Sequence, residues 1–252
     1  MKRKNLSLIF CLITAMLLAA CGGKEPEPTQ TPEVIEPVVE EPQASPLETC
    51  AMNIDMPGPS AYPPVYCDDF ENPDTVTMPL GEDENKWGKM TLDVYNGKYT
   101  ARVEVKRDNA LRLSIPIQDV RDFIIQVDGR LASHSGHPYH YWGFFFKADA
   151  EFENYYYFMV DNNQYYYFVL VRGDNLTNLI NGRKSEDLNP LDEGNFITVV
   201  CSGDTYSFYI NGTYQEEFSD NRLLTGAVGL YSEMRKDTTL DWEFDNLVVY
   251  AQ

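Results

Sequence analysis

The feature that most limits the fold of this chain is a series of short runs in which apolar and polar residues alternate. The runs are rich in Val, Ile, Tyr and Phe, and turn pairs such as Asn-Gly, Gly-Asp and Asp-Asn separate them. Alternation with a period of two is typical of β-strands, and no stretch shows sustained helical spacing of apolar residues. About ten strands without crossover helices predict an all-β fold, an antiparallel sandwich or barrel.

Two neighbouring predicted strands, near residues 155–160 and 165–172, are aromatic on both faces. Eight of the 17 tyrosines lie between positions 139 and 167. One face fills the core, and we expect the other to form an exposed aromatic groove. We assign the face without phenylalanine to the groove, because a tyrosine hydroxyl needs a polar partner. The expected groove residues are Tyr155, Tyr157, Tyr165 and Tyr167, with Trp142 and His140 at the rim. A slip of one residue would exchange the two faces.

Six short motifs follow one another along the chain and carry a family resemblance. They are Asp-Asp-Phe at 68–70, Gly-Phe-Phe-Phe-Lys at 143–147, Tyr-Tyr-Tyr-Phe at 155–158, Ile-Asn-Gly at 210–212, Gly-Ala-Val-Gly-Leu at 226–230 and Phe-Asp-Asn at 244–246. In this order they resemble the concanavalin A-like lectin/glucanase superfamily, which includes laminin-G-like and keto-disaccharide-hydrolase-like domains. The resemblance covers residues 68–250 and implies a two-sheet jelly roll whose concave sheet binds carbohydrate.

The resemblance raises the question of hydrolysis. Glucanases of that superfamily carry Glu-x-Asp-x-x-Glu, and a retaining mechanism needs two carboxyl groups about 5–5.5 Å apart. The motif is absent. The nearest carboxylates are Glu151 and Glu153, interpreted as surface charge, and the row Asp241, Glu243 and Asp245 on the last strand. We therefore expect no catalytic residues and a non-catalytic carbohydrate-binding domain. A glycoside-active enzyme and a structural or adhesive protein-binding lipoprotein stay open as alternatives.

Two groups of residues are candidate metal ligands. By the resemblance, Asp69 and Asp245 are expected near a structural calcium, which prefers hard oxygen ligands. The alternative is a carboxylate bonded to the neighbouring strand. His134, His137 and His140 lie in one loop and could hold zinc or copper. They could also form a polar rim beside the groove, or donate a hydrogen bond to a sugar hydroxyl.

The N-terminal residues predict export and a lipid anchor. Lys-Arg-Lys at 2–4 precedes an apolar stretch at 6–20, which is too short to span a bilayer and has the length of a signal-peptide core. Leu-Ala-Ala-Cys at 18–21 resembles the bacterial lipobox, in which the cysteine, here Cys21, is lipidated after cleavage. The resemblance implies a cell-surface or periplasmic protein, and Gly22 favours the outer membrane in a cell with two membranes. The alternative is an ordinary secretory signal.

The remaining residues divide into a linker and one domain. Residues 21–49 are rich in Pro and Glu and cannot bury enough apolar area to fold, so they predict a disordered tether. Residues 50–252 form the predicted sandwich. The net charge of −19 argues against nucleic-acid binding and against docking on anionic lipid, so the lipid anchor is the expected membrane contact and a glycan the expected partner.

Three cysteines remain for the folded domain. Cys50 and Cys67 bracket an irregular stretch rich in Pro and Gly, and we predict that they form a disulfide. Two free thiols are the alternative. Cys201 alternates with Ile197 and Val199 and is expected to face the core.

Overall fold

The computed structural model describes residues 62–252 together with Leu47 and Cys50. Between residues 62 and 252, the regular elements are fifteen β-strands and one 3-10 helix, Pro73–Thr75. The predicted signal peptide, Cys21 and nearly all of the predicted linker lie outside the described residues. Within the described part, no helix has the length and apolarity that a membrane crossing requires.

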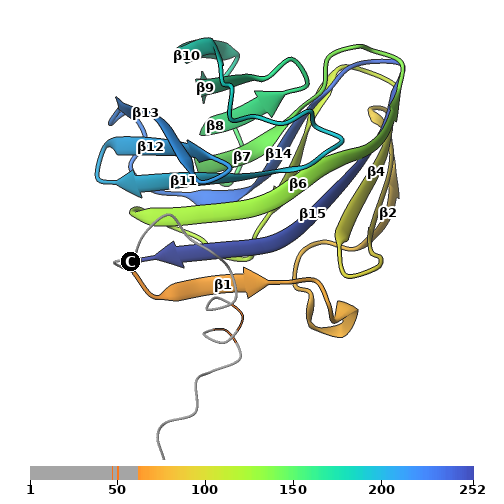
Figure 1. The fold of residues 1–252 in the computed structure, drawn as a ribbon, viewed down its shortest axis with the longest axis horizontal. Coiled ribbons are helices and arrows are strands. Elements are labelled where there is room, and N and C mark those ends of the chain that lie inside the picture. The colour runs from red at the N-terminus through yellow and green to blue at the C-terminus, as the bar shows by residue number, and fades with distance from the viewer. Residues whose placement is uncertain (1–46, 48–49, 51–61) are drawn as a thin grey trace, which may run out of the picture. The chain divides into compact units, whose positions relative to one another are not determined.

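The strands form two antiparallel sheets, which confirms the predicted all-β sandwich (Figure 1). The larger sheet has nine strands in the order β13-β12-β11-β6-β15-β4-β3-β2, and β1 joins it by pairing with β15. Its strands are β1 (Pro64–Asp68), β2 (Gly81–Glu84), β3 (Gly88–Val94), β4 (Tyr99–Val105), β6 (Phe123–Ser135), β11 (Asn195–Ser202), β12 (Thr205–Ile210), β13 (Thr213–Ser219) and β15 (Thr238–Ala251).

The smaller sheet has six strands in the order β10-β9-β8-β7-β14-β5. Its strands are β5 (Asn109–Ser114), β7 (Tyr141–Ala148), β8 (Asn154–Asp161), β9 (Tyr165–Arg172), β10 (Asn175–Lys184) and β14 (Ala227–Met234). Strands β7 to β10 follow one another as a meander, so one face of this sheet is built from a contiguous stretch of chain.

Strand β15 organises the larger sheet. One of its edges pairs with β6, and the other pairs first with β4 and then with β1 (Figure 1). The register with β6 shifts between Asp245 and Val248, where Asn246 adopts a φ of 51°. A bulge of this kind bends a strand, and here it lies where β15 exchanges one neighbour for the other.

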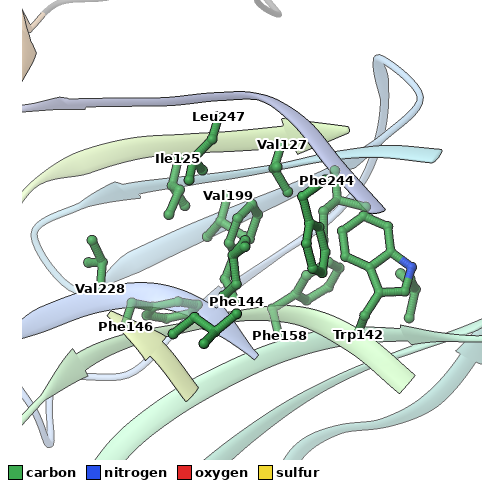
Figure 2. Close-up of a cluster of buried hydrophobic side chains, with 14 of the residues drawn as sticks. Ile125, Val127, Trp142, Phe144, Phe146, Phe158, Val199, Val228, Phe244 and Leu247 are labelled. Carbon is green, nitrogen blue, oxygen red and sulfur yellow. The ribbon is translucent and has the colours of Figure 1, made fainter. Parts of the chain in front are cut away.

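The core lies between the two sheets and follows directly from the alternation in the sequence. Figure 2 shows Phe144, Phe146 and Phe158 of the smaller sheet close to Ile125, Val127, Val199, Phe244 and Leu247 of the larger one. The aromatic side chains of the smaller sheet in this group are fully buried. Burying each such side chain contributes about 1.5–3 kcal/mol, so this layer supplies most of the stabilising apolar contact.

Close approach between strands accounts for the glycine at position 143. A Cβ atom there would collide with the backbone of β8 at the carbonyl oxygen of Phe158. Gly129 on β6 has a similar role opposite the ring of Trp142, which would occupy the space of any larger side chain. The indole of Trp142 therefore reaches across the core to the larger sheet, where it also packs edge-on against Phe244 with ring centroids 5.7 Å apart.

Candidate functional site

The outward surface of the smaller sheet carries a second set of aromatic side chains. We name this set the tyrosine face, and its members are Tyr141, Phe145, Tyr155, Tyr157, Tyr167 and Tyr231. The residues that alternate with them along the same strands, including Phe158 and Phe168, point the other way and belong to the core between the sheets. The strand register places Tyr155, Tyr157 and Tyr167 on the outward face, which is the side that the sequence predicts.

The exposure of these tyrosines differs from the expectation of an open groove. Tyr155 and Tyr157 are each only 3% exposed, whereas Tyr165 is 36% exposed and Tyr167 is half-buried. The rings cover one another, because Tyr157 stacks on Tyr231 with centroids 4.5 Å apart and an interplanar angle of 9°. The inner part of the tyrosine face is therefore a second, smaller core, and only its margin is open to a ligand.

Internal hydrogen bonds occupy the hydroxyl groups of this face. Tyr155 accepts a bond from Arg112 at 2.7 Å, Tyr157 donates to Glu233 at 3.4 Å, and Tyr167 donates to Asp161 at 3.0 Å. Burial is the main cause that raises the pKa of the Tyr157 and Tyr167 hydroxyls, with the adjacent carboxylates adding to it. These tyrosines are therefore neutral at physiological pH, and their hydroxyls already have partners.

Two carboxylates, Asp161 and Glu233, stand on the tyrosine face. In the strand register Tyr141 lies between them, so two strand spacings of about 4.8 Å separate their backbones. Asp161 accepts the backbone N–H groups of Asn163 in the following turn and of Tyr165 at the start of β9, at 2.8 and 2.9 Å, and Glu233 pairs with Arg235 at 2.7 Å. Burial raises the pKa of Glu233, and Arg235 opposes this shift. Each carboxylate is thus held by its own neighbours.

An open pocket of about 310 Å³ lies at the β5 edge of the sandwich, and we call it the edge pocket. Trp87 and Phe152 are its two aromatic lining residues. Trp87 lies in the turn between β2 and β3 and is 39% exposed, and its carbonyl oxygen accepts backbone N–H groups from the β4–β5 turn at 2.8 and 3.2 Å. Asp83, Asn85 and Asn109 add polar groups to the lining.

Arg112 connects the edge pocket to the tyrosine face. It lines the pocket from β5, and its guanidinium lies over the rings of Tyr155 and Phe152, at 5.0 and 5.9 Å from their centroids. The same group donates the 2.7 Å hydrogen bond to Tyr155. A flat cation stacked on aromatic rings is held in one orientation, so the positive charge at the pocket wall is fixed in place.

The two residues expected at the groove rim are buried instead. Trp142 is fully buried in the core, because it shares the inward face of β7 with Phe144 (Figure 2). Trp142 is expected at the rim because it follows a loop in the sequence. The alternation of side chains along β7 instead places it on the face toward the core. His140 is 1% exposed, with its Nε2 atom 3.0 Å from Nδ1 of His134. Burial first, and then the neighbouring histidines, lower the pKa of His140 to about 4.

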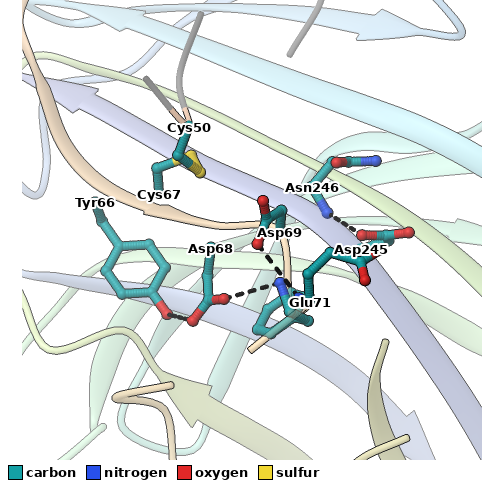
Figure 3. Close-up of a disulfide and its surroundings, with 9 residues drawn as sticks. Cys50, Tyr66, Cys67, Asp68, Asp69, Glu71, Asp245 and Asn246 are labelled. Atoms are coloured by element: carbon teal, nitrogen blue, oxygen red, sulfur yellow. Dashed lines mark hydrogen bonds between the residues drawn. A yellow bond between two sulfur atoms is a disulfide. The ribbon is translucent and has the colours of Figure 1, made fainter. Parts of the chain in front are cut away.

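The predicted disulfide and calcium residues lie near the first strand (Figure 3). The structure joins Cys50 to Cys67 of β1 by a disulfide, with the Cα atoms 6.1 Å apart. Asp69 accepts the backbone N–H of Glu71 at 3.3 Å. Asp245 pairs with Lys98 at 2.9 Å, so an ammonium group already occupies one side of its carboxylate.

These contacts do not fit a calcium ion well. Calcium takes six to eight oxygen ligands, and two carboxylates with other partners supply few of them. Across residues 62–252 with Leu47 and Cys50, no group of three or more His, Cys, Asp or Glu residues is arranged to hold a metal ion. This includes the three histidines. The calcium site stays a prediction, and the Lys98 contact counts against it.

Sequence reasoning missed the edge pocket altogether. Trp87 is the one signal in the sequence, since it lies in a polar stretch next to Asn85 and Lys86 and outside the predicted strands. Phe152 follows Glu151 in a segment interpreted as surface charge, and Arg112 lies inside a predicted strand. Nothing in the sequence shows that these three residues meet, because their elements become neighbours only when the sheets form.

Comparisons with known proteins identify the fold. No protein-family model and no curated protein matches the sequence. Among solved structures, a galectin-like protein of unknown function from Bacillus subtilis matches with a TM-score of 0.57 at 13% identity, covering 75% of this chain and 96% of that one.

Two further matches are proteins that act on or bind carbohydrate. The catalytic domain of an endo-1,3-β-glucanase, a laminarinase from Thermotoga petrophila, has a TM-score of 0.53 at 10% identity, with 76% and 98% of the two chains covered. A carbohydrate-binding module from Bacillus subtilis, CBM66, has a TM-score of 0.50 at 14% identity, with 69% and 94% covered. The domain thus has the jelly-roll fold of the concanavalin A-like lectins and glucanases.

Proposed function

We propose that this domain is a non-catalytic carbohydrate-binding module, and the edge pocket is the observation that carries the proposal. Trp87 is 39% exposed and Phe152 is half-buried, and together they offer aromatic surface on which the C–H face of a sugar ring can stack. Asn109 provides an amide group for sugar hydroxyls, and the Asn85 amide, which is bonded to Asp83 and to the backbone of Trp87, keeps one further N–H donor. Small-ligand pockets combine apolar walls with a few polar groups in this way, and about 310 Å³ suits one sugar ring.

The internal hydrogen bonds and the ion pair of the two carboxylates on the tyrosine face support binding without hydrolysis. A retaining glycosidase needs one free nucleophile and one free acid about 5–5.5 Å apart. Asp161 is bonded to two backbone N–H groups and to Tyr167, and Glu233 is paired with Arg235. Neither is free to attack a sugar.

The N-terminal sequence supports a location for this activity. The basic residues at 2–4, the apolar stretch and Cys21 together favour a lipoprotein whose acidic linker holds the domain away from the membrane. In this proposal a glycan outside the cell is the partner, and the lipid is the membrane contact.

A polysaccharide panel tests the proposal. We expect the protein to be retained by at least one polysaccharide without releasing reducing sugar. Trp87→Ala should weaken that binding about tenfold, since a stacked contact is lost. Tyr214→Ala is the matched control, because Tyr214 is 52% exposed on β13 and does not line the edge pocket. Retention by none of the polysaccharides would contradict the proposal, and sugar release would make the protein an enzyme.

A further inference from the structure

Within residues 62–252, Arg112 stacks on aromatic rings without an acidic partner, as Lys86 and Lys147 also do, whereas several other arginines of the domain have one. Arg102, Arg130 and Arg235 each lie within 3.0 Å of a carboxylate oxygen. Among the residues that the structure describes, Arg112 makes no ion pair, and its hydrogen bond goes to the neutral hydroxyl of Tyr155. Its Nε atom is buried without a hydrogen-bond partner. A guanidinium has five N–H donors, so most of its capacity is unused.

An unpaired, half-buried cation is costly unless something supplies the opposite charge. This chain has 39 acidic residues, yet none of them lies within ion-pair distance of Arg112 in the described part. The one carboxylate that lines the edge pocket, Asp83, accepts a 2.7 Å hydrogen bond from Asn85. An anionic group on a ligand bound in the edge pocket could therefore pair with Arg112.

The inference rests on the proposed function and names the class of sugar. We propose that the edge pocket binds a sugar ring that carries one carboxylate or sulfate group. The ring stacks on Trp87 and Phe152, and the anion accepts charge-assisted hydrogen bonds from Arg112, whose planar fork matches both groups. One charge is specified because the net charge of −19 repels a dense polyanion.

Titration of tryptophan fluorescence tests the inference on the full-length protein, purified in a detergent whose headgroup contains no sugar. Trp87 reports on the pocket, because Trp142 and Trp242 are 0% and 1% exposed. The ligands are matched oligosaccharides in three forms: neutral, with one uronate, and with one sulfate. We expect tighter binding of one or both anionic forms, by about 10- to 100-fold over the neutral form. Comparing the uronate with the sulfate distinguishes the two sources of charge.

Two variants test whether the preference for an anionic sugar depends on the charge of Arg112 and not on a change in folding. Arg112→Met keeps a long apolar side chain over Tyr155, and it should remove the preference for the anionic form. Arg121→Met makes the same change in charge on an exposed residue outside the pocket, and it should leave the preference intact. Thermal melting checks that both variants fold.

If Arg112→Met does not fold, the salt dependence of the wild-type protein decides, because binding of an anion to a cation weakens as salt screens the charges. Equal affinity for neutral and anionic forms, or affinity independent of salt, would overturn the inference and leave carbohydrate binding standing. Failure of all three forms and of the polysaccharide panel would overturn the proposed function itself.

Discussion

The most direct test of the tyrosine face is to truncate Tyr157, a residue that the sequence assigns to an open groove and the structure buries. Tyr157 is 3% exposed and stacks on Tyr231 at 4.5 Å. If its ring belongs to a small core, Tyr157→Ala should destabilise the fold. If it belongs to an open surface, the same change should affect ligand binding and leave stability nearly unchanged.

The structure sets the expected magnitude. Replacing a buried aromatic residue by alanine costs about 3–5 kcal/mol of unfolding free energy, of which a stacked pair such as Tyr157 with Tyr231 supplies about 0.5–1.5 kcal/mol. Tyr157→Phe keeps the stack and removes one hydroxyl, whose 3.4 Å bond to Glu233 is long, so its loss should cost about 1 kcal/mol or less. Tyr165→Ala removes a residue that is 36% exposed and should cost roughly 1 kcal/mol.

Urea denaturation at pH 7, followed by circular dichroism, measures all three variants against the wild-type protein. The expected order of destabilisation is Tyr157→Ala, far above Tyr165→Ala and Tyr157→Phe. A cost below about 1.5 kcal/mol for Tyr157→Ala, close to that of Tyr165→Ala, would refute the reasoning and restore the open groove.

Three further outcomes are expected. Reduction of the Cys50–Cys67 disulfide, or Cys67→Ser, should lower the unfolding free energy by about 3 kcal/mol for a loop of this length, measured by thermal melting with and without reductant; an unchanged melting temperature would contradict this. The pKa of His140 is lowered to about 4 from an unfolded value near 6.5, so the folded protein binds fewer protons and stability is lost as the pH falls from 6.5 to 4. This loss is about 2 kcal/mol after allowance for solvent, and the difference in urea stability between pH 7 and pH 4.5 should shrink in His140→Gln; equal differences would count against it. Cys21→Ser should move the protein from the membrane fraction to the soluble fraction, and retention with the membrane would argue against the lipid anchor.

Strand alternation predicted the fold class and the sides of the aromatic strands because both depend on the side-chain period alone. Phe158 and Phe168 marked the core face, and Tyr155 and Tyr157 fell on the other. Alternation says which way a side chain points, and it does not say what covers it. Burial of the two tyrosines depends on Arg112 and on rings from other strands, which the sequence does not place beside them.

The strand at 81–84, which strand alternation does not predict, and the missed pocket share a physical cause. The strand 81–84 reads Gly-Glu-Asp-Glu and is exposed at every residue, because an edge strand at the margin of a sheet has no core to face. Without a buried side there is no apolar alternation to detect. Trp87 lies in the turn after this strand and lines the edge pocket. Because alternation does not predict the strand, it does not predict the pocket beside it either.

The disulfide between Cys50 and Cys67 decides how mechanical tension enters the domain. In a chain held by its N-terminal residues, a pull on a ligand of the domain would pass to β1 and from there to the disulfide at Cys67. Cys67 is the fourth of the five residues of β1, so the β1–β15 hydrogen bonds near the C-terminal end of β1 would bear the load, and the disulfide would bypass the segment between the cysteines. Breaking the bridge would add that segment to the force path. Its 17-residue separation corresponds to about 50 Å of extension beyond the 6.1 Å that already separates the two Cα atoms, a step that single-molecule pulling can resolve.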